Sequence, residues 1–184
     1  MKKSILSTLF LGIFLSACNT NNAQNADKKI KEEASEQGIN IDPSEKTGTF
    51  NFDGKEVTGK MENQYFGDKE KGNFSVLCQY EEGGDPMNAN FALLQITFLN
   101  EKDATTNPSL KIYDGNMLPM TDPEPGAVVI SLSGVGLNLG NKQFNGTDKS
   151  TGRISVNDRT LILHEVVLYN SDGEKRTINA KLPF

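Results

Sequence analysis

The sequence lacks tryptophan altogether and contains a single histidine and two cysteines among its 184 residues. A catalytic triad built on that one histidine, His164, would need further partners, and the Gly-x-Ser-x-Gly signature of a nucleophile elbow is absent. Without tryptophan, stacking on a sugar ring would fall to tyrosine and phenylalanine. Neither a common hydrolase signature nor a strong sugar-stacking signature is therefore present.

A long apolar run is also missing. The run from Ile5 to Ala17 is shorter than the roughly 20 residues that a spanning helix needs, and hydroxyl side chains interrupt it. Lys2 and Lys3 precede it, and small residues follow before an abruptly polar stretch that starts at Asn19. A positive end, a short apolar stretch and small residues before a cleavage point predict a secretory signal over residues 1–17.

The end of this segment, Leu15-Ser16-Ala17-Cys18, resembles the signal of bacterial lipoproteins. The resemblance implies that Cys18 becomes the first residue of the mature protein and carries acyl chains such as palmitate. Burial of such chains contributes ~0.8 kcal/mol per CH₂, and two or three chains together anchor firmly. By the same resemblance, Asn19 in place of aspartate favours the outer membrane. We expect a protein of the bacterial cell envelope whose membrane partner is lipid, held through Cys18.

The charge balance is acidic. The formal charge is −5, and removal of residues 1–17 with their two lysines brings it to −7. This balance gives no electrostatic footprint for nucleic acid, so we expect no nucleic-acid partner. Once Cys18 is acylated, Cys78 is the only remaining thiol. It alternates with Phe74, Val76 and Tyr80, which predicts a buried and unreactive side chain.

Two regions follow the signal. Residues 18–46 have few apolar side chains and many Asn, Lys, Glu and Asp, which predicts a lipidated, flexible tether. Residues 47–184 alternate apolar and polar side chains between turn signals such as Asp53-Gly54, which predicts a single β-rich domain. The last strand alternates cleanly, with Ile178, Ala180, Leu182 and Phe184 on the buried side.

We expect an all-β fold, an antiparallel β-sandwich, with a small closed β-barrel as the alternative. Two observations favour the sandwich. Within an expected strand from Val128 to Leu139, the apolar side chains change from even-numbered to odd-numbered positions near Ser133-Gly134, as if one strand passed between sheets. The segment Thr160–Tyr169 has apolar side chains at both even-numbered and odd-numbered positions, as in a central strand covered on both faces.

Few residues suggest chemistry. His164 lies beside Glu165, but adjacent strand residues point to opposite faces, so we expect a satisfied histidine in or near the core. Glu81, Glu82 and Asp85, like Asp122 and Glu124 in a proline-rich loop, lack EF-hand spacing and are interpreted as solvated charge. We therefore assign no catalytic residue, no metal ligand and no cofactor.

Aromatic side chains near turn signals are the best candidates for a ligand surface. Tyr65, Phe66 and Tyr113 meet that criterion and form our tentative ligand surface. The favoured function is a non-enzymatic, membrane-anchored lipoprotein whose β-domain binds a protein or a glycan. The alternative is an envelope hydrolase with a site assembled from distant carboxylates or His164. A membrane barrel, which the terminal Phe184 suggests, is disfavoured by Pro183 and by charges in most strands.

Overall fold

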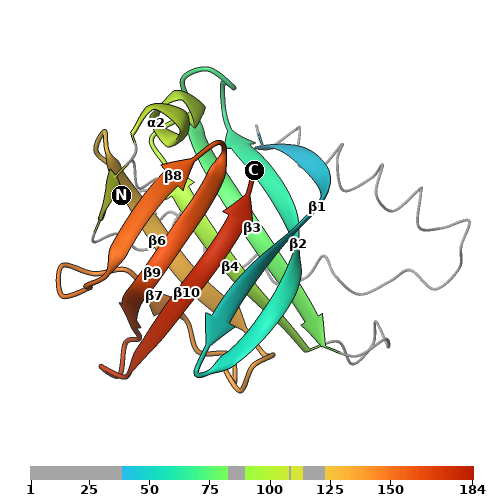
Figure 1. Cartoon of the computed structure of the whole chain (residues 1–184), viewed down its shortest axis with the longest axis vertical. Helices are drawn as coiled ribbons and strands as arrows, with labels where there is room; N and C mark the ends of the chain where they lie inside the picture. The colour runs from blue at the N-terminus through green and yellow to red at the C-terminus, as the bar shows by residue number, and fades with distance from the viewer. Residues whose placement is uncertain (1–38, 83–89, 108, 114–122) are drawn as a thin grey trace, which may run out of the picture.

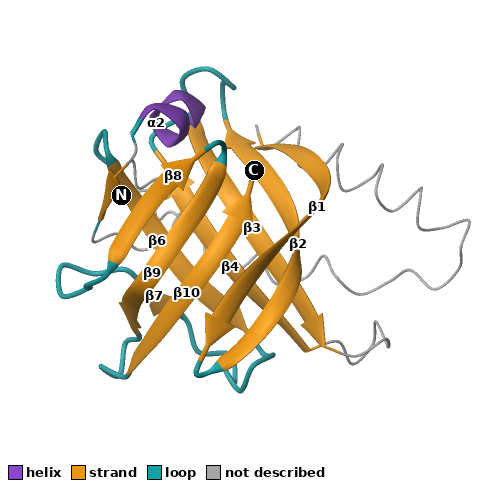
Figure 2. Cartoon of the chain, in the orientation of Figure 1, coloured by secondary structure: helices purple, strands orange, loops and turns teal. Residues whose placement is uncertain are grey.

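The structure is a computed structural model that describes residues 39–82, 90–107, 109–113 and 123–184. The signal segment, Cys18 and most of the expected tether lie outside these residues. The described elements are β1 (Ile39–Phe52), β2 (Lys55–Phe66), β3 (Asn73–Glu82), β4 (Asn90–Phe98), α2 (Glu101–Thr106), β5 (Ser109–Ile112), β6 (Ala127–Gly134), β7 (Phe144–Asn145), β8 (Arg153–Asn157), β9 (Thr160–Tyr169) and β10 (Lys175–Pro183) (Figure 1, Figure 2).

Within the described residues, nine strands form one closed sheet. The order is β10-β1-β2-β3-β4-β6-β5-β8-β9, and β9 pairs again with β10. Neighbours are antiparallel except β5 and β6, which run parallel. The short strand β7 also joins β6 to β9, at Leu132–Phe144 and Asn145–Tyr169. The all-β prediction is thus confirmed and the closed barrel fits, whereas two packed sheets are not what the pairing shows.

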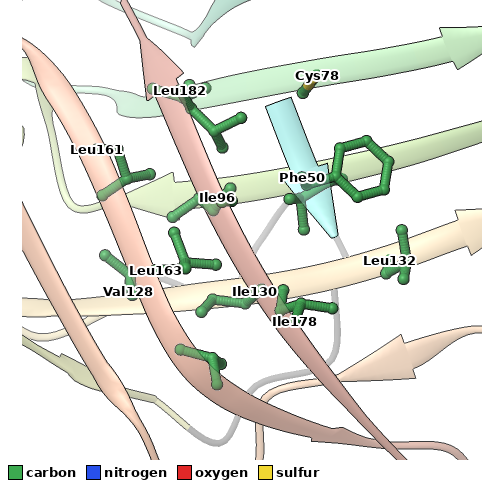
Figure 3. Close-up of a cluster of buried hydrophobic side chains, with 14 of the residues drawn as sticks. Phe50, Cys78, Ile96, Val128, Ile130, Leu132, Leu161, Leu163, Ile178 and Leu182 are labelled. Carbon is green, nitrogen blue, oxygen red and sulfur yellow. The ribbon is translucent and has the colours of Figure 1, made fainter. Parts of the chain in front are cut away.

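Apolar side chains fill the interior of this barrel. The side chains of β9 and β10, such as Leu163 and Ile178, meet those of β4 and β6, such as Ile96 and Ile130, from the opposite wall (Figure 3). All four are at most 2 % exposed. The predicted alternation of β10 is confirmed, since its even-numbered residues from Ile178 are buried and its odd-numbered ones are exposed or half-buried. Small barrels of about this strand number are just wide enough for side chains to fill.

Both ends of the barrel are closed by aromatic rings. At one end, Phe52 and Phe144 meet edge to face with ring centroids 6.2 Å apart. At the other, Phe184 packs against Phe74 and Phe98, with centroid distances of 5.7 and 6.3 Å. Helix α2, which begins after its N-cap Asn100, lies at this second end. The all-β prediction did not include this helix of six residues.

The change of apolar positions near Ser133-Gly134 does not come from a strand that passes between two sheets, as expected. Strand β6 ends at Gly134, and residues 135–141 form a turn rather than a continued strand. Leu137 and Asn138 have φ values of 55° and 59°, and the amides of Val135 and Gly136 both donate to the carbonyl of Phe91. The strand therefore stops at a tight turn and does not cross between sheets.

The two-sided apolar pattern of β9 comes from a β-bulge. On β10, Ile178 and Ala180 are two residues apart, whereas their partners Val166 and Leu163 on β9 are three apart. The extra residue is at Glu165, whose φ is 50° and whose amide donates to Asn179 Oδ1 at 2.9 Å. The buried parity consequently changes along β9, so one buried face imitates two in the sequence.

The first strand also begins earlier than the boundary at Thr47 predicts. Strand β1 starts at Ile39 and pairs with β2 from Ile39–Phe66 onward, with a register shift between Pro43 and Thr47. Residues 39–46, expected in the tether, therefore belong to the sheet. Helix α2 has six residues, and no helix in the described ranges has the length and apolar character to cross a membrane.

Candidate functional site

Tyr65, the first residue of the tentative ligand surface, is buried. Its side chain is 2 % exposed, its ring lies 5.1 Å from that of Phe74, and its hydroxyl donates to Glu101 Oε2 at 3.1 Å. The prediction of an exposed ring was wrong because Tyr65 shares the inward parity of Val57 and Met61 along β2. The turn that follows does not alter which side of the strand it occupies.

The other two residues of that surface are not brought together. Phe66 is half-buried at the end of β2, and Tyr113 is half-buried directly after β5, with its amide donating to the carbonyl of Val128. In the sheet order, β3, β4 and β6 lie between these two strands. The three aromatic residues therefore do not form one binding surface.

His164 is exposed, which contradicts the predicted core position. Its side chain is 56 % exposed, and its Nδ1 lies 3.9 Å from Glu165 Oε2. The argument that two adjacent residues must face opposite sides fails here because the bulge at Glu165 turns both side chains outward. Among the described residues, no three His, Cys, Asp or Glu side chains are grouped so as to hold a metal ion.

The two carboxylates at the end of β3, Glu81 and Glu82, each bind a side chain of the same barrel. Glu82 forms an ion pair with Lys55 at 2.8 Å, and this hydrogen bond lowers the pKa of Glu82. Glu81 accepts from Gln79 Nε2 at 2.7 Å. Asp85 and Asp122 lie outside the described residues, and Glu124 is exposed.

A groove on the outer side of the barrel is lined by polar and basic side chains as well as two isoleucines. It measures about 290 Å³ and is lined by Ser109, Arg153, Ile154, Ser155, Ile162 and His164. Strand pairing sets these residues side by side: Arg153 is opposite His164, Ser155 is opposite Ile162, and Ser109 is opposite Ser155. On its other side, Ile162 is opposite Lys181 of β10. The strands β8, β9 and β10 lie next to one another on the near side of the barrel in Figure 1.

Basic side chains surround Ile162 on this surface. We call Lys111, Arg153, His164 and Lys181, on the neighbouring strands β5, β8, β9 and β10, the basic face. All four are exposed. Their strands contain one acidic residue, Glu165, although the whole chain carries a formal charge of −5. In the part of the chain that the structure describes, no carboxylate pairs with Lys111, Arg153 or Lys181.

No sequence pattern predicts this basic face, because its residues come from separate strands. Outward positions can be read from the alternation of each strand, but nothing local says that β5 lies beside β8 or β10 beside β9. The net charge also hides this surface, because an excess of acidic residues over the whole chain conceals a locally basic region.

A second concavity, of about 270 Å³, lies at the Phe52 end of the barrel and is lined by Phe52, Asp53, Lys55, Glu82, Leu137 and Asn138. Its charges are already paired within the molecule. Lys55 binds Glu82, and Arg176 Nε lies 2.8 Å from Asp53 Oδ2. This concavity therefore offers less unpaired charge to a ligand than the groove on the basic face.

Comparison of the chain with protein-family models, with curated proteins and with solved structures finds no match.

Proposed function

We propose that this protein is a bacterial lipoprotein, anchored in the cell envelope through acyl chains on Cys18, whose non-catalytic β-barrel binds a protein or glycan partner. The observation that carries the anchor is the segment Leu15-Ser16-Ala17-Cys18 after a short apolar run. Asn19, in place of aspartate, supports placement in the outer membrane. Lipid would thus be one partner and a second envelope component the other.

The barrel itself supports binding on the outside rather than inside. Its interior is filled by apolar side chains, and the two concavities described above lie on its surface. A side-chain-filled barrel acts as a rigid scaffold, and recognition then falls to its outer strands and loops.

A catalytic role through distant carboxylates has less support. Glu82, Glu101 and Glu174 each accept a hydrogen bond from a basic side chain, and the pKa of each is lowered. A general acid needs a raised pKa near the working pH. His164 lies exposed on the outer face of β9 with Arg153 opposite, and its Nδ1 is 3.9 Å from Glu165 Oε2, too far for a hydrogen bond that would orient the ring.

Metabolic labelling with an alkyne analogue of palmitate tests the anchor. The chain has two cysteines, so Cys18→Ala should abolish labelling and move the protein from the membrane to the soluble fraction, whereas Cys78→Ala should leave both unchanged. Equal labelling of wild type and Cys18→Ala, or loss of labelling only in Cys78→Ala, would overturn the anchor. Cross-linking in intact cells tests the partner, and a protein that cross-links to no envelope component would count against binding.

A further inference from the structure

The basic face is a locally basic patch on an acidic protein, and among its four residues only His164 lies within 4 Å of a described carboxylate, that of Glu165. Arg153, Lys111 and Lys181 have no ion-pair partner among the described residues, whereas four other basic side chains of the domain, Lys55, Lys142, Arg159 and Arg176, lie 2.8 Å from carboxylate oxygens. A concentration of one charge sign in a groove raises the local concentration of ligands of the opposite sign. The patch is therefore arranged for an anionic ligand.

Its dimensions indicate more than a single small ion. The four basic residues lie on four consecutive strands, and neighbouring strands are about 4.8 Å apart, so the row extends roughly 14 Å across the barrel. An extended chain with repeated anionic groups would place successive charges along such a row. Arg153 can hold one carboxylate through two parallel hydrogen bonds.

The groove, which Arg153 and His164 line, combines hydroxyl groups with the apolar side chains of Ile154 and Ile162. Ser109 and Ser155 face each other across β5 and β8, and Asn179 lies two residues from Lys181 on β10. Hydroxyl and amide groups both donate and accept hydrogen bonds, which matches the hydroxyl groups of a sugar. Ile162, 36 % exposed, is the largest exposed apolar side chain here, so an occupant that relies on buried apolar anchors would find little to pack against.

The closed sheet argues against an extended peptide as the occupant. Peptides commonly add a strand to an open sheet edge, but each strand of this ring has a neighbour on both sides. The remaining recognition is by side chains on a convex wall. Charge and hydroxyl groups, rather than backbone pairing, would then select the ligand.

We infer that the basic face binds an acidic polysaccharide, with sugar carboxylates on Arg153, Lys111 and Lys181 and sugar hydroxyls on the serines of the groove. This inference rests on the proposed function, because it names which envelope component the barrel binds and where.

The test uses the full-length lipidated protein in non-ionic detergent and measures binding to immobilised polygalacturonate, with neutral dextran as the uncharged counterpart. The double variant Arg153→Gln/Lys181→Gln should weaken binding about tenfold or more, because exposed interfacial charges set electrostatic recognition. The matched control Lys60→Gln/Lys71→Gln removes the same charge from exposed positions on β2, which β1 separates from β10, and on the β2–β3 turn, and should change binding less than about twofold. The single variant Lys111→Gln provides a smaller, graded loss if the double variant does not fold.

Equal weakening by the two double variants would overturn the inference, since binding would then follow net charge alone. Poly-L-glutamate bound as tightly as polygalacturonate would indicate an acidic protein segment instead, and preferential binding to phosphatidylglycerol vesicles would indicate a lipid surface. Palmitate labelling of the same variants separates the two proposals. Labelled protein that ignores polygalacturonate contradicts only the inference, whereas unlabelled protein that binds it contradicts only the anchor.

Discussion

Arg159 Nη2 donates a hydrogen bond of 2.8 Å to Glu101 Oε1, which ties the β8–β9 turn to the first residue of helix α2. The other oxygen of Glu101 accepts from the hydroxyl of Tyr65 at 3.1 Å. The guanidinium of Arg159 also lies 5.1 Å from the centre of the Phe184 ring. One carboxylate thus joins helix α2 to strand β2 and to the β8–β9 turn, which are distant in sequence.

Replacement of Glu101 by Gln should make stability less dependent on pH. Burial alone would raise the pKa of Glu101, but hydrogen bonds from Arg159 and Tyr65 outweigh it and lower the pKa. A lowered folded-state pKa stabilises the fold above the unfolded-state pKa, near 4.5, and this contribution is lost as the pH falls through the folded-state value. Urea denaturation should show Glu101→Gln destabilised by about 1 kcal/mol at neutral pH, with the difference from wild type shrinking in acid. Glu56→Gln, at an exposed position of β2, controls for the lost charge, and a difference that grows in acid would refute the pairing.

Cys78 should react with thiol reagents only when the protein unfolds. Its side chain is fully buried, as the sequence analysis predicted, and burial raises its pKa to about 11. At pH 8 only on the order of 0.1 % of such a thiol is ionised, and the thiolate is the reactive form. A chromogenic disulfide should therefore modify the native protein far more slowly than the protein in denaturant, with Cys78→Ala as the blank. Similar rates in both conditions would mean that the barrel opens readily around β3.

Removal of residues 182–184 should destabilise the barrel strongly. Leu182 and Phe184 are at most 2 % exposed, and Phe184 fills the helical end against Phe74 and Phe98. Phe184→Ala alone should cost about 3–5 kcal/mol, because truncation of a buried ring removes apolar burial and leaves a cavity. Thermal unfolding followed by circular dichroism measures the loss. Lys175→Gln, an exposed change on the same strand, should leave the melting temperature unchanged, and an unchanged midpoint after the truncation would contradict the packing.

The bulge on β9 should depend on Asn179. Its Oδ1 accepts from the amide of Glu165, which the bulge leaves outside the regular pairing with β10. Asn179→Ala should lower the free energy of unfolding by about 1 kcal/mol and speed hydrogen exchange at the Glu165 amide. Thr177→Ala, also exposed on β10, is the control. Unchanged exchange at Glu165 would show that the bulge forms without this contact.

The individual strands of this protein are largely readable from its sequence, whereas their closure is not. The alternation of β4 and β10 and the turn at Asp53-Gly54, where both φ values are positive, follow from local patterns. The prediction of a sandwich depended on two places where the apolar side chains change between even-numbered and odd-numbered positions. One is the end of β6 and the other is the bulge at Glu165, and a pattern of apolar residues does not distinguish a bulge from a strand covered on both faces.

The candidate site was even harder to predict from the sequence than the closure of the sheet. The turn after Tyr65 suggested an exposed ring, although its odd-numbered position matches the inward residues of β2. The basic face depends on which strands become neighbours. Ile162 has Ser155 on one side and Lys181 on the other only because the sheet closes between β9 and β10. Such long-range pairing is not encoded in any short segment.

Strand β10 pairs with β9 on one side and with β1 on the other, so that Thr49 lies beside Lys181. A growing chain cannot form either of these ladders before its last strand has been made. Until then β1 and β9 both present open backbone donors and acceptors, to which another copy of the chain could add. Closure between such distant segments raises the contact order and slows folding. A chain in which β10 has not yet docked therefore exposes two unpaired strand edges, and self-association can begin at either of them.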